Sequence, residues 1–302
     1  MNEIVMKMND GFKISALYSK VDNPIGVVQI IHGMCEHKKR YIEIINRLNE
    51  AKYNVLISDL RGHGKSIDEI HVLGNVGDYN RLVKDQYEIT NFLKNDNPSL
   101  PINILAHSMG TLIARMYLKE YDNEINKLIL SGTVAYNTGV WLAVFLASIF
   151  NKNKSSKLLF AFSNGFSFKE DNSWLSYNLE NIEKYENDPL CGFKFTNLGY
   201  KALYSMVNNL HKYNKFEFQN PNLEIYMLSG CDDRVTGGTK GLSKTKKTLE
   251  KIGYHNIKIK EYERMKHEIL NEDSKVEVID DIIKFLGERW WIIVINVVLN
   301  WF

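Results

Sequence analysis

Of the 302 residues, 38 are Lys or Arg and 36 are Asp or Glu, so the formal net charge is only +2. This near balance excludes a strongly basic nucleic-acid-binding protein. With 44% hydrophobic and 25% charged residues, the composition is that of a globular chain and excludes the disordered and collagen-like classes.

The chain begins with a hairpin signal. The turn NDG at residues 9–11 separates two β-like runs, EIVMKM and FKISALY, which predicts two antiparallel strands. This stretch lacks the continuous apolar core of a signal peptide. Cys35, Cys191 and Cys231 are odd in number and far apart, so they do not indicate a disulfide framework. We therefore expect a reduced, cytoplasmic protein.

Six further β-like runs follow the hairpin. They lie at residues 26–33, 54–60, 102–108, 126–132, 223–230 and 256–262. Helix-period segments lie between or after most of them, at residues 38–52, 78–94, 111–121, 241–252 and 275–289. Strands that alternate with helices imply right-handed crossovers. The pattern therefore predicts an eight-stranded, mostly parallel α/β sheet flanked by helices.

The alternation breaks after the sixth strand. We predict that residues 133–222 form a helical lid inserted into an α/β core of residues 1–132 and 223–289. The insertion opens with an apolar run at residues 139–150, GVWLAVFLASIF. A buried lid helix, the lining of an acyl pocket and contact with a membrane surface are all open interpretations of this run.

A second apolar run, WWIIVINVVLNWF, closes the chain at residues 290–302. As a helix it would span only about 20 Å, against the roughly 30 Å of a bilayer core. We therefore treat it as an extension beyond the core. An interfacial anchor, a subunit contact and the product of an altered reading frame remain alternatives.

The most informative motif is AHSMG at residues 106–110, directly after a predicted strand and directly before a predicted helix. This is the context of a nucleophile elbow. Such a turn projects the Ser108 hydroxyl out of the sheet and aims the first amides of the helix at developing negative charge. We therefore interpret Ser108 as a nucleophile rather than as an ordinary helix-capping serine.

A serine nucleophile requires an acid and a histidine later in the chain, in the order Ser, Asp, His. SGCDDRV follows the seventh predicted strand, and MKHE follows the eighth. His267 is therefore the expected general base. We favour Asp233 as the acid, although spacing alone leaves an exchange of roles with Asp232 open.

Acyl transfer also needs an oxyanion hole, formed by the amide after the nucleophile and by an amide of the loop after the third strand. Met109 provides the first. In HGMCEH at residues 32–37, Gly33 permits a sharp turn and the Met34 N–H is the candidate for the second.

Two other motifs resemble ligand sites only superficially. The histidines and the glutamate of HGMCEH have neither the H-E-x-x-H nor the H-x-x-E-H spacing of a zinc site, so we expect no metal. DLRGHGKS at residues 59–66 ends like a phosphate-binding loop but has Asp59 where that pattern requires glycine. We expect a turn with a structural Arg61 and His63.

Together these motifs resemble the α/β-hydrolase superfamily, and within it the monoacylglycerol lipase and lysophospholipase group of serine hydrolases. The resemblance covers residues 3–289 and extends to KHEILNE at residues 266–272 and NDPLCGFKFT at residues 187–196. It implies that Ser108 is the nucleophile, Asp233 the acid and His267 the base, with the amides of Met34 and Met109 as the oxyanion hole.

Three residues depart from the pattern of this group. Ala106 and Thr111 replace glycines at the elbow, and Cys35 stands where glycine is frequent in the oxyanion loop. None of these changes removes a catalytic atom, but Thr111 and Cys35 could narrow the pocket.

We therefore predict a serine hydrolase that cleaves carboxylic esters, of monoacylglycerols or lysophospholipids, through an acyl-Ser108 intermediate. The expected partner is a small lipid ester. No nucleic acid and no cofactor is implied, because the triad and backbone amides suffice for acyl transfer. Peripheral membrane contact through the lid or the C-terminal extension is left open.

Two other functions remain as alternatives. A serine aminopeptidase of the related branch would need a lid carboxylate to hold a substrate amine, and Glu183, Glu186 and Asp188 are available. A non-catalytic ligand-binding protein could keep the same scaffold. A dehalogenase or epoxide hydrolase is disfavoured, because those enzymes place Asp where Ser108 stands.

Overall fold

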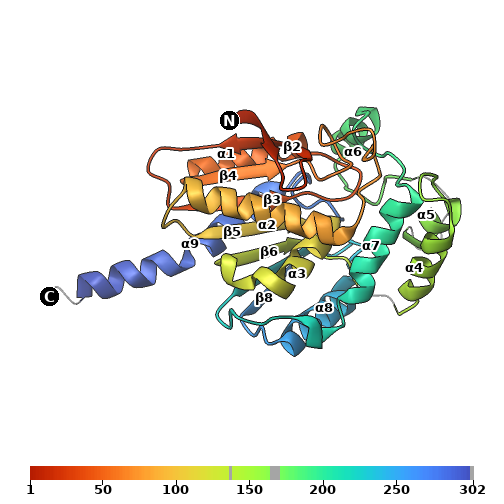
Figure 1. Cartoon of the computed structure of the whole chain (residues 1–302). Helices are drawn as coiled ribbons and strands as arrows, with labels where there is room; N and C mark the ends of the chain where they lie inside the picture. The colour runs from red at the N-terminus through yellow and green to blue at the C-terminus, as the bar shows by residue number, and fades with distance from the viewer. Residues whose placement is uncertain (136–137, 164–170, 300–302) are drawn as a thin grey trace.

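An eight-stranded sheet forms the centre of the molecule (Figure 1). The computed structural model describes residues 1–135, 138–163 and 171–299, with side chains up to residue 287. The strands are β1 (Asn2–Lys7), β2 (Lys13–Ser19), β3 (Gly26–Ile31), β4 (Tyr53–Ser58), β5 (Ile102–His107), β6 (Lys127–Ser131), β7 (Glu224–Gly230) and β8 (Ile257–Tyr262). Their order in the sheet is β1-β2-β4-β3-β5-β6-β7-β8.

The strand directions confirm the predicted fold class. β1 pairs with β2, and β2 with β4, in antiparallel register. From β4 to β8 every neighbouring pair is parallel. The carboxyl ends of these parallel strands therefore meet at one edge, where loops from distant parts of the sequence come together.

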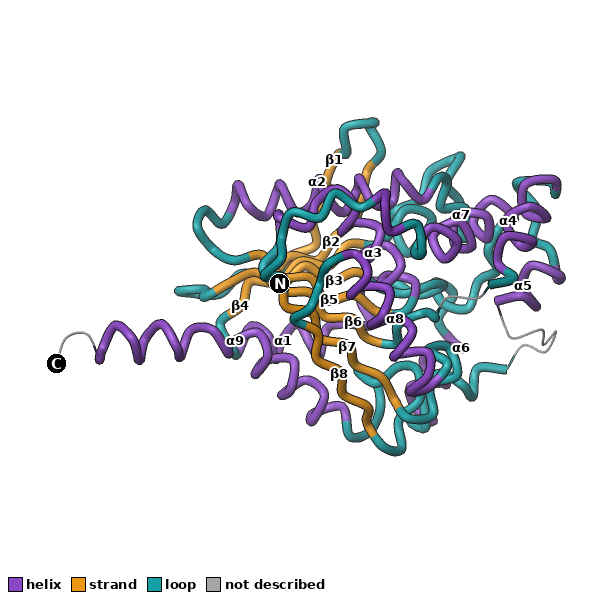
Figure 2. Tube along the Cα trace, turned by 90° about the horizontal axis from the view of Figure 1, so that it is seen from below, coloured by secondary structure: helices purple, strands orange, loops and turns teal. Residues whose placement is uncertain are grey.

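Helices cover both faces of the sheet (Figure 2). Outside the inserted segment they are α1 (Ile42–Glu50), α2 (Tyr79–Asp96), α3 (Met109–Tyr121), α8 (Gly238–Ile252) and α9 (Lys275–Leu299), with short 3-10 turns η1 (Lys38–Tyr41) and η2 (Asp122–Glu124). In β3, Val27 and Ile31 pack on the side of α2 and α3, whereas Val28 and Ile30 pack on the side of α1 and α9. Because both faces are buried, β3 is apolar at almost every position.

The stretch between β6 and β7, residues 133–222, is called the inserted segment below. Its described part contains no strand and comprises α4 (Val140–Ile149), α5 (Lys157–Ser163), α6 (Leu179–Asn187), α7 (Asn197–Asn209) and the 3-10 turn η3 (Tyr213–Lys215). Asn178 caps α6 and Thr196 caps α7, each side chain accepting a hydrogen bond from a backbone amide of the first turn. Helices α4 to α7 lie beyond one end of the strands (Figure 1).

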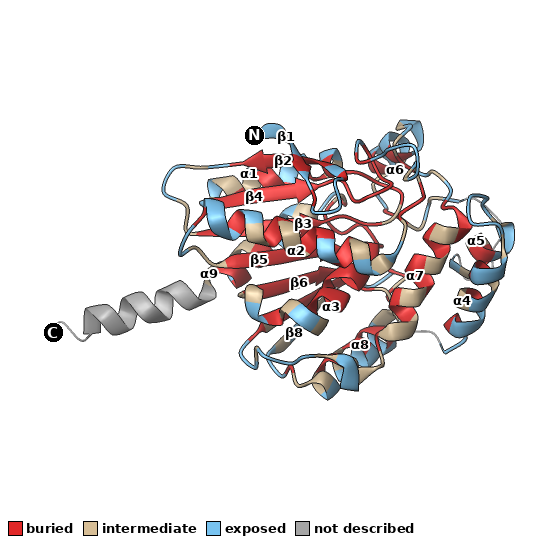
Figure 3. Cartoon of the chain, in the orientation of Figure 1, coloured by how far each residue is buried: buried red, intermediate tan, exposed pale blue. Residues whose placement is uncertain are grey.

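Helix α4 joins the body of the molecule through only one of its faces. Val140, Ala143 and Ala147 are buried against the main hydrophobic core, and α4 packs along α7. The opposite face of α4 is open to solvent (Figure 3).

The end of the last helix corrects one prediction. We expected a helix over residues 275–289, but α9 continues to Leu299. No glycine or proline follows Arg289 to stop it. Side chains from residue 288 onward and residues 300–302 lie outside the described structure, and so do the proposed roles of residues 290–302. Within the described residues, every helix is too short or too polar to span a bilayer.

Candidate active site

Ser108 lies in a strained turn between β5 and α3. Its backbone has φ 51° and ψ −119°, a conformation that residues other than glycine rarely adopt. At this turn the helix lies so close to β3 that a Cβ on Gly110 would be only 2.3 Å from the Ile31 carbonyl oxygen. Ala106, by contrast, is a fully buried part of the regular strand β5, so its methyl group is accommodated without a change in the turn.

A chain of two hydrogen bonds joins Ser108 to loops that follow two other strands. His267 Nε2 lies 2.7 Å from Ser108 Oγ, and His267 Nδ1 lies 3.0 Å from Asp233 Oδ2. The other oxygen of Asp233 accepts the Val235 N–H at 2.8 Å. This arrangement holds the imidazole with Nε2 turned toward the serine hydroxyl, as removal of a proton from that hydroxyl requires.

The two neighbouring acids differ sharply in environment. Asp233 is 2% exposed and faces His267. Asp232 is exposed and accepts a hydrogen bond from the Tyr177 hydroxyl at 3.0 Å. The structure therefore places Asp233, and not Asp232, against His267.

Two backbone amides beside Ser108 have no acceptor among the described residues. They are the N–H groups of Met34 and Met109. Their neighbours in the loop after β3 are engaged: Gly33 N–H donates to Glu36 Oε1 at 2.6 Å, and Cys35 N–H donates to His63 Nε2 at 3.3 Å. Thus side chains fix the loop on both sides of Met34, while the amide of Met34 itself remains available.

The ionisable groups of the site influence one another. Burial alone would lower the pKa of His267, but the charge and hydrogen bond of Asp233, with smaller effects from Glu268 and Glu36, raise it above its ordinary value. Burial and the neighbouring His267 lower the pKa of His107 to about 4, so His107 is neutral near pH 7. Burial would raise the pKa of Asp233, but the charge and hydrogen bond of His267, with a smaller effect from the Val235 N–H, lower it overall.

These directions predict the pH dependence of the reaction. His267 must be neutral to accept a proton, so kcat/KM should fall as the pH decreases through the raised pKa of His267. We expect one acid limb, with its midpoint above the ordinary imidazole value of 6.5. A profile of kcat/KM from about pH 5 to about pH 9 measures it. A midpoint at or below the ordinary imidazole value of 6.5 would contradict the prediction.

A buried ionic network lies behind the site and was missed by the sequence analysis. Arg40 forms two hydrogen bonds of 2.7 Å to Glu268, the residue after His267, and another of 3.1 Å to Glu36. Arg40 and Glu268 also contact Asn181 of α6. Glu36 and Glu268 both lie within recognised motifs, but nothing in one sequence links them to Arg40.

One part of the inserted segment covers His267. The Trp174 ring lies 5.1 Å from the His267 ring, and the Arg234 guanidinium lies 5.1 Å from the same indole. The Leu175 carbonyl accepts the Glu268 N–H at 2.8 Å. This part of the segment therefore forms a wall of the site.

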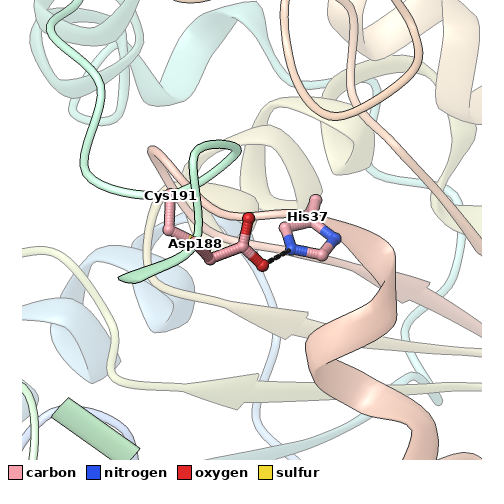
Figure 4. Close-up of side chains that lie close together, drawn as sticks. All are labelled: His37, Asp188 and Cys191. Carbon is pink, nitrogen blue, oxygen red and sulfur yellow. Dashed lines mark hydrogen bonds and ion pairs between the residues drawn. The ribbon is translucent and has the colours of Figure 1, made fainter. Parts of the chain in front are cut away.

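A second cluster joins the oxyanion loop to the inserted segment (Figure 4). One ligand atom from each of His37, Asp188 and Cys191 lies within 4.8 Å of the others, and His37 Nε2 lies 2.8 Å from Asp188 Oδ2. His37 Nδ1 accepts the Lys39 N–H, so Nε2 carries the ring proton and donates it to Asp188. A metal ion bound to Nε2 would displace the ring proton to Nδ1. The protonated Nδ1 would then face the Lys39 N–H, which is also a donor. We therefore interpret this cluster as a polar contact between the two loops.

The segment after β4 uses its charges in ion pairs. Arg61 is buried and forms two hydrogen bonds of 3.0 Å to Asp85. Asp59 accepts hydrogen bonds from the Lys38 ammonium and from the Lys65 N–H. These contacts give the turn a structural role, as predicted from its sequence.

The fold and the site define the class of protein, a serine hydrolase of the α/β-hydrolase fold. The chain belongs to the family whose model, Hydrolase_4, is described as Serine aminopeptidase, S33, and which matches residues 22–274. Within this family, the chain belongs to the monoacylglycerol lipase-like and lysophospholipase-like group.

Individual relatives support this grouping. The chain is 26% identical over 269 residues to a monoacylglycerol lipase of Mycolicibacterium smegmatis, covering 87% of this chain and 89% of that protein. It is also 26% identical to phospholipase YtpA of Bacillus subtilis, with 86% of this chain and 94% of that protein covered. Among solved structures, a thermostable carboxyl esterase from Bacillus coagulans superposes with a TM-score of 0.83 at 25% identity, covering 95% and 98% of the two chains.

Proposed function

We propose that this enzyme hydrolyses carboxylic esters with a single fatty acyl chain, monoacylglycerols or lysophospholipids, through an acyl intermediate on Ser108. The observation that carries the proposal is the hydrogen-bonded chain from Ser108 Oγ through His267 to Asp233, beside two amides without an acceptor in the described structure. A nucleophile, a base with its orienting acid and an oxyanion hole are the parts that acyl transfer requires.

In the first half of the reaction, Ser108 Oγ attacks the ester carbonyl carbon while its proton moves to His267 Nε2. The negative charge that forms on the carbonyl oxygen is stabilised by the N–H groups of Met34 and Met109. When the tetrahedral intermediate collapses, the carbon–oxygen bond to the alcohol breaks and His267 returns the proton to the departing alcohol. The acyl group remains on Ser108 as an ester.

In the second half, a water molecule takes the place of the alcohol. His267 removes a proton from the water as it attacks the acyl carbon, and the proton then passes to Ser108 Oγ as the fatty acid leaves. Asp233 stays ionised throughout and stabilises the imidazolium that forms in each half. The lowered pKa of Asp233 suits this role.

Relatives and the exposed face of α4 support a lipid substrate. The M. smegmatis and B. subtilis relatives, which the chain matches over most of their length, are a monoacylglycerol lipase and a phospholipase. Trp141, Phe145 and Ile149 of α4 are 62%, 56% and 61% exposed. We infer that the inserted segment acts as a lid and that this face of α4 contacts a lipid surface.

The contact with lipid gives a direct prediction. Phe145→Glu should lower binding to phosphatidylcholine vesicles by about tenfold or more, because it removes a large apolar side chain and adds a charge. Hydrolysis of a soluble short-chain ester should not change. The matched control is Val5→Glu on the edge strand β1, where Val5 is 66% exposed. Equal vesicle binding by both variants and the wild type, measured by co-sedimentation, would contradict a role for α4.

The aminopeptidase alternative receives less support from the acids of the inserted segment. Asp188 contacts His37, and Glu186 contacts Asn172, whereas Glu183 lies at the surface beside an open depression formed by α6. No contact links these carboxylates to Ser108 in the described structure.

We also place the enzyme in a reducing cytoplasm, because Cys35, Cys191 and Cys231 are free thiols.

Substrate profiling tests the proposed function. We would measure hydrolysis of monoacylglycerols and lysophosphatidylcholines of increasing chain length, together with aminoacyl-proline peptides, and label Ser108 with a fluorophosphonate. Activity that is greatest on long acyl chains supports the proposal. Activity confined to short esters would remove the lipid substrate, and preferential release of amino acids would favour the aminopeptidase. The absence of both turnover and labelling would favour a binding protein.

A further inference from the structure

The general base lies in a loop that is held by hydrogen bonds on both sides of His267, to the inserted segment on one side and to Glu272 on the other. We call residues 265–272 the base loop and residues 174–178 the covering segment. On one side of His267, the Glu268 N–H donates to the Leu175 carbonyl at 2.8 Å. On the other side, the Lys266 N–H donates to Glu272 Oε1 at 2.8 Å.

Glu272 binds the covering segment as well as the base loop. Its carboxylate accepts hydrogen bonds from the Ser176 hydroxyl at 2.7 Å, from the Tyr177 N–H at 2.9 Å and from the Asn178 N–H at 3.2 Å. The side chain is only 1% exposed. Four donor groups from two separate stretches of chain therefore converge on one buried carboxylate.

From these contacts we propose that Glu272 is a positioning residue, which fixes His267 relative to Ser108 by joining the base loop to the covering segment. The inference rests on the proposed function and goes beyond it. Glu272 does not touch the reacting atoms and acts only through the backbone amides and the Ser176 hydroxyl that it holds. Through the same contacts it keeps Trp174 against the His267 ring.

The two parts of the inserted segment then differ in their attachment. The covering segment is bonded to the base loop through Leu175 and Glu272, whereas α5 is attached to α7 by the hydrogen bond from the Tyr204 hydroxyl to the Leu159 carbonyl. Helix α4 also packs on α7. The covering segment is therefore the part of the inserted segment that is fixed to the base loop.

Glu272→Gln is the sharpest test of this role. The variant keeps the size of the side chain but replaces an acceptor oxygen with an NH2 group that faces N–H and O–H donors. We expect kcat to fall by about tenfold or more with KM changed by less than about threefold, because the loss is in alignment rather than in substrate binding. The acid limb of the pH profile should move toward the ordinary imidazole value as the His267–Asp233 contact loosens.

Asp122 provides a matched control. It is also a fully buried carboxylate and accepts hydrogen bonds from the N–H groups of Gln219 and Asn220 and from the Tyr254 hydroxyl. It lies in η2, which follows α3 and precedes β6, away from the base loop. Asp122→Asn should lower the melting temperature as Glu272→Gln does, but leave kcat and the pH profile unchanged.

Rates of fluorophosphonate labelling separate failure of this inference from failure of the proposed function. If the wild type is labelled at Ser108 and hydrolyses esters, a folded E272Q with wild-type kcat, labelling rate and pH profile would overturn the positioning role. If the wild type neither reacts with the probe nor hydrolyses esters, the proposed function fails, and this inference fails with it. Should E272Q not fold, E272D, which shortens the side chain and keeps its charge, gives the same decision: reduced kcat supports the role and unchanged kcat overturns it.

Discussion

Ser108→Ala should abolish ester hydrolysis while leaving the fold intact. The substitution removes only Oγ, and the Ser108 side chain makes no hydrogen bond in the described structure other than that to His267. Without a nucleophile, no acyl intermediate forms, and we expect kcat to fall by about 10⁴-fold or more. Turnover of a monoacylglycerol and labelling by a fluorophosphonate both measure the effect.

The control for this variant is its thermal unfolding. The strained backbone at residue 108 is retained with alanine, so the melting temperature should stay close to that of the wild type. Full activity in a folded Ser108→Ala protein would contradict the assignment of the nucleophile. Loss of activity together with loss of the folded state would instead require Ser108→Cys, which retains a nucleophilic atom at the same position.

Asp233→Asn should have the second largest effect. An amide at this position can present an NH2 group to His267 Nδ1 and so favour the tautomer in which Nε2 carries the proton and cannot accept one from Ser108. It also removes the charge that stabilises the imidazolium. We expect kcat to fall by about 10³- to 10⁴-fold, measured on the same ester substrate.

Asp232→Asn is the matched control for this variant, because it makes the same chemical change one residue away. Asp232 is exposed, and in the described structure its side chain forms a hydrogen bond only with the Tyr177 hydroxyl. Its replacement should change kcat by less than about threefold. If D232N lost as much activity as D233N, the two acids would have to exchange roles.

The sheet was predictable because its signals are local. The central parallel strands, such as β5 and β7, are short apolar runs that are buried on both faces, whereas the edge strand β8 is partly exposed. The turns after β5, β7 and β8 carry recognisable motifs in chain order. Pattern alone therefore predicted all eight strands and the convergence of the loops at one edge. The choice between Asp232 and Asp233 was harder, because adjacent residues differ only in the direction that the turn gives their side chains.

The ionic network around Arg40 and the contacts of Glu272 could not be predicted, because they join residues that are far apart in the sequence. Arg40 and Glu268 are separated by 228 positions, and Glu272 binds amides more than 90 positions away. A buried carboxylate that accepts backbone N–H groups leaves no pattern of its own, because the donors belong to any residue type. The end of α9 was misjudged for another reason: a change from polar to apolar residues is no helix stop signal.

The long separations within the site also affect how the protein acquires activity during its synthesis. Ser108 leaves the ribosome well before its base, since 159 positions separate it from His267. Contacts of this range close late in folding, because each requires a large loop to be ordered first. The nascent chain therefore carries an unactivated serine alcohol until the base loop docks on the covering segment. Activity then measures completion of the native structure, and a chain truncated before β8 would be inert toward esters even if its central strands had assembled.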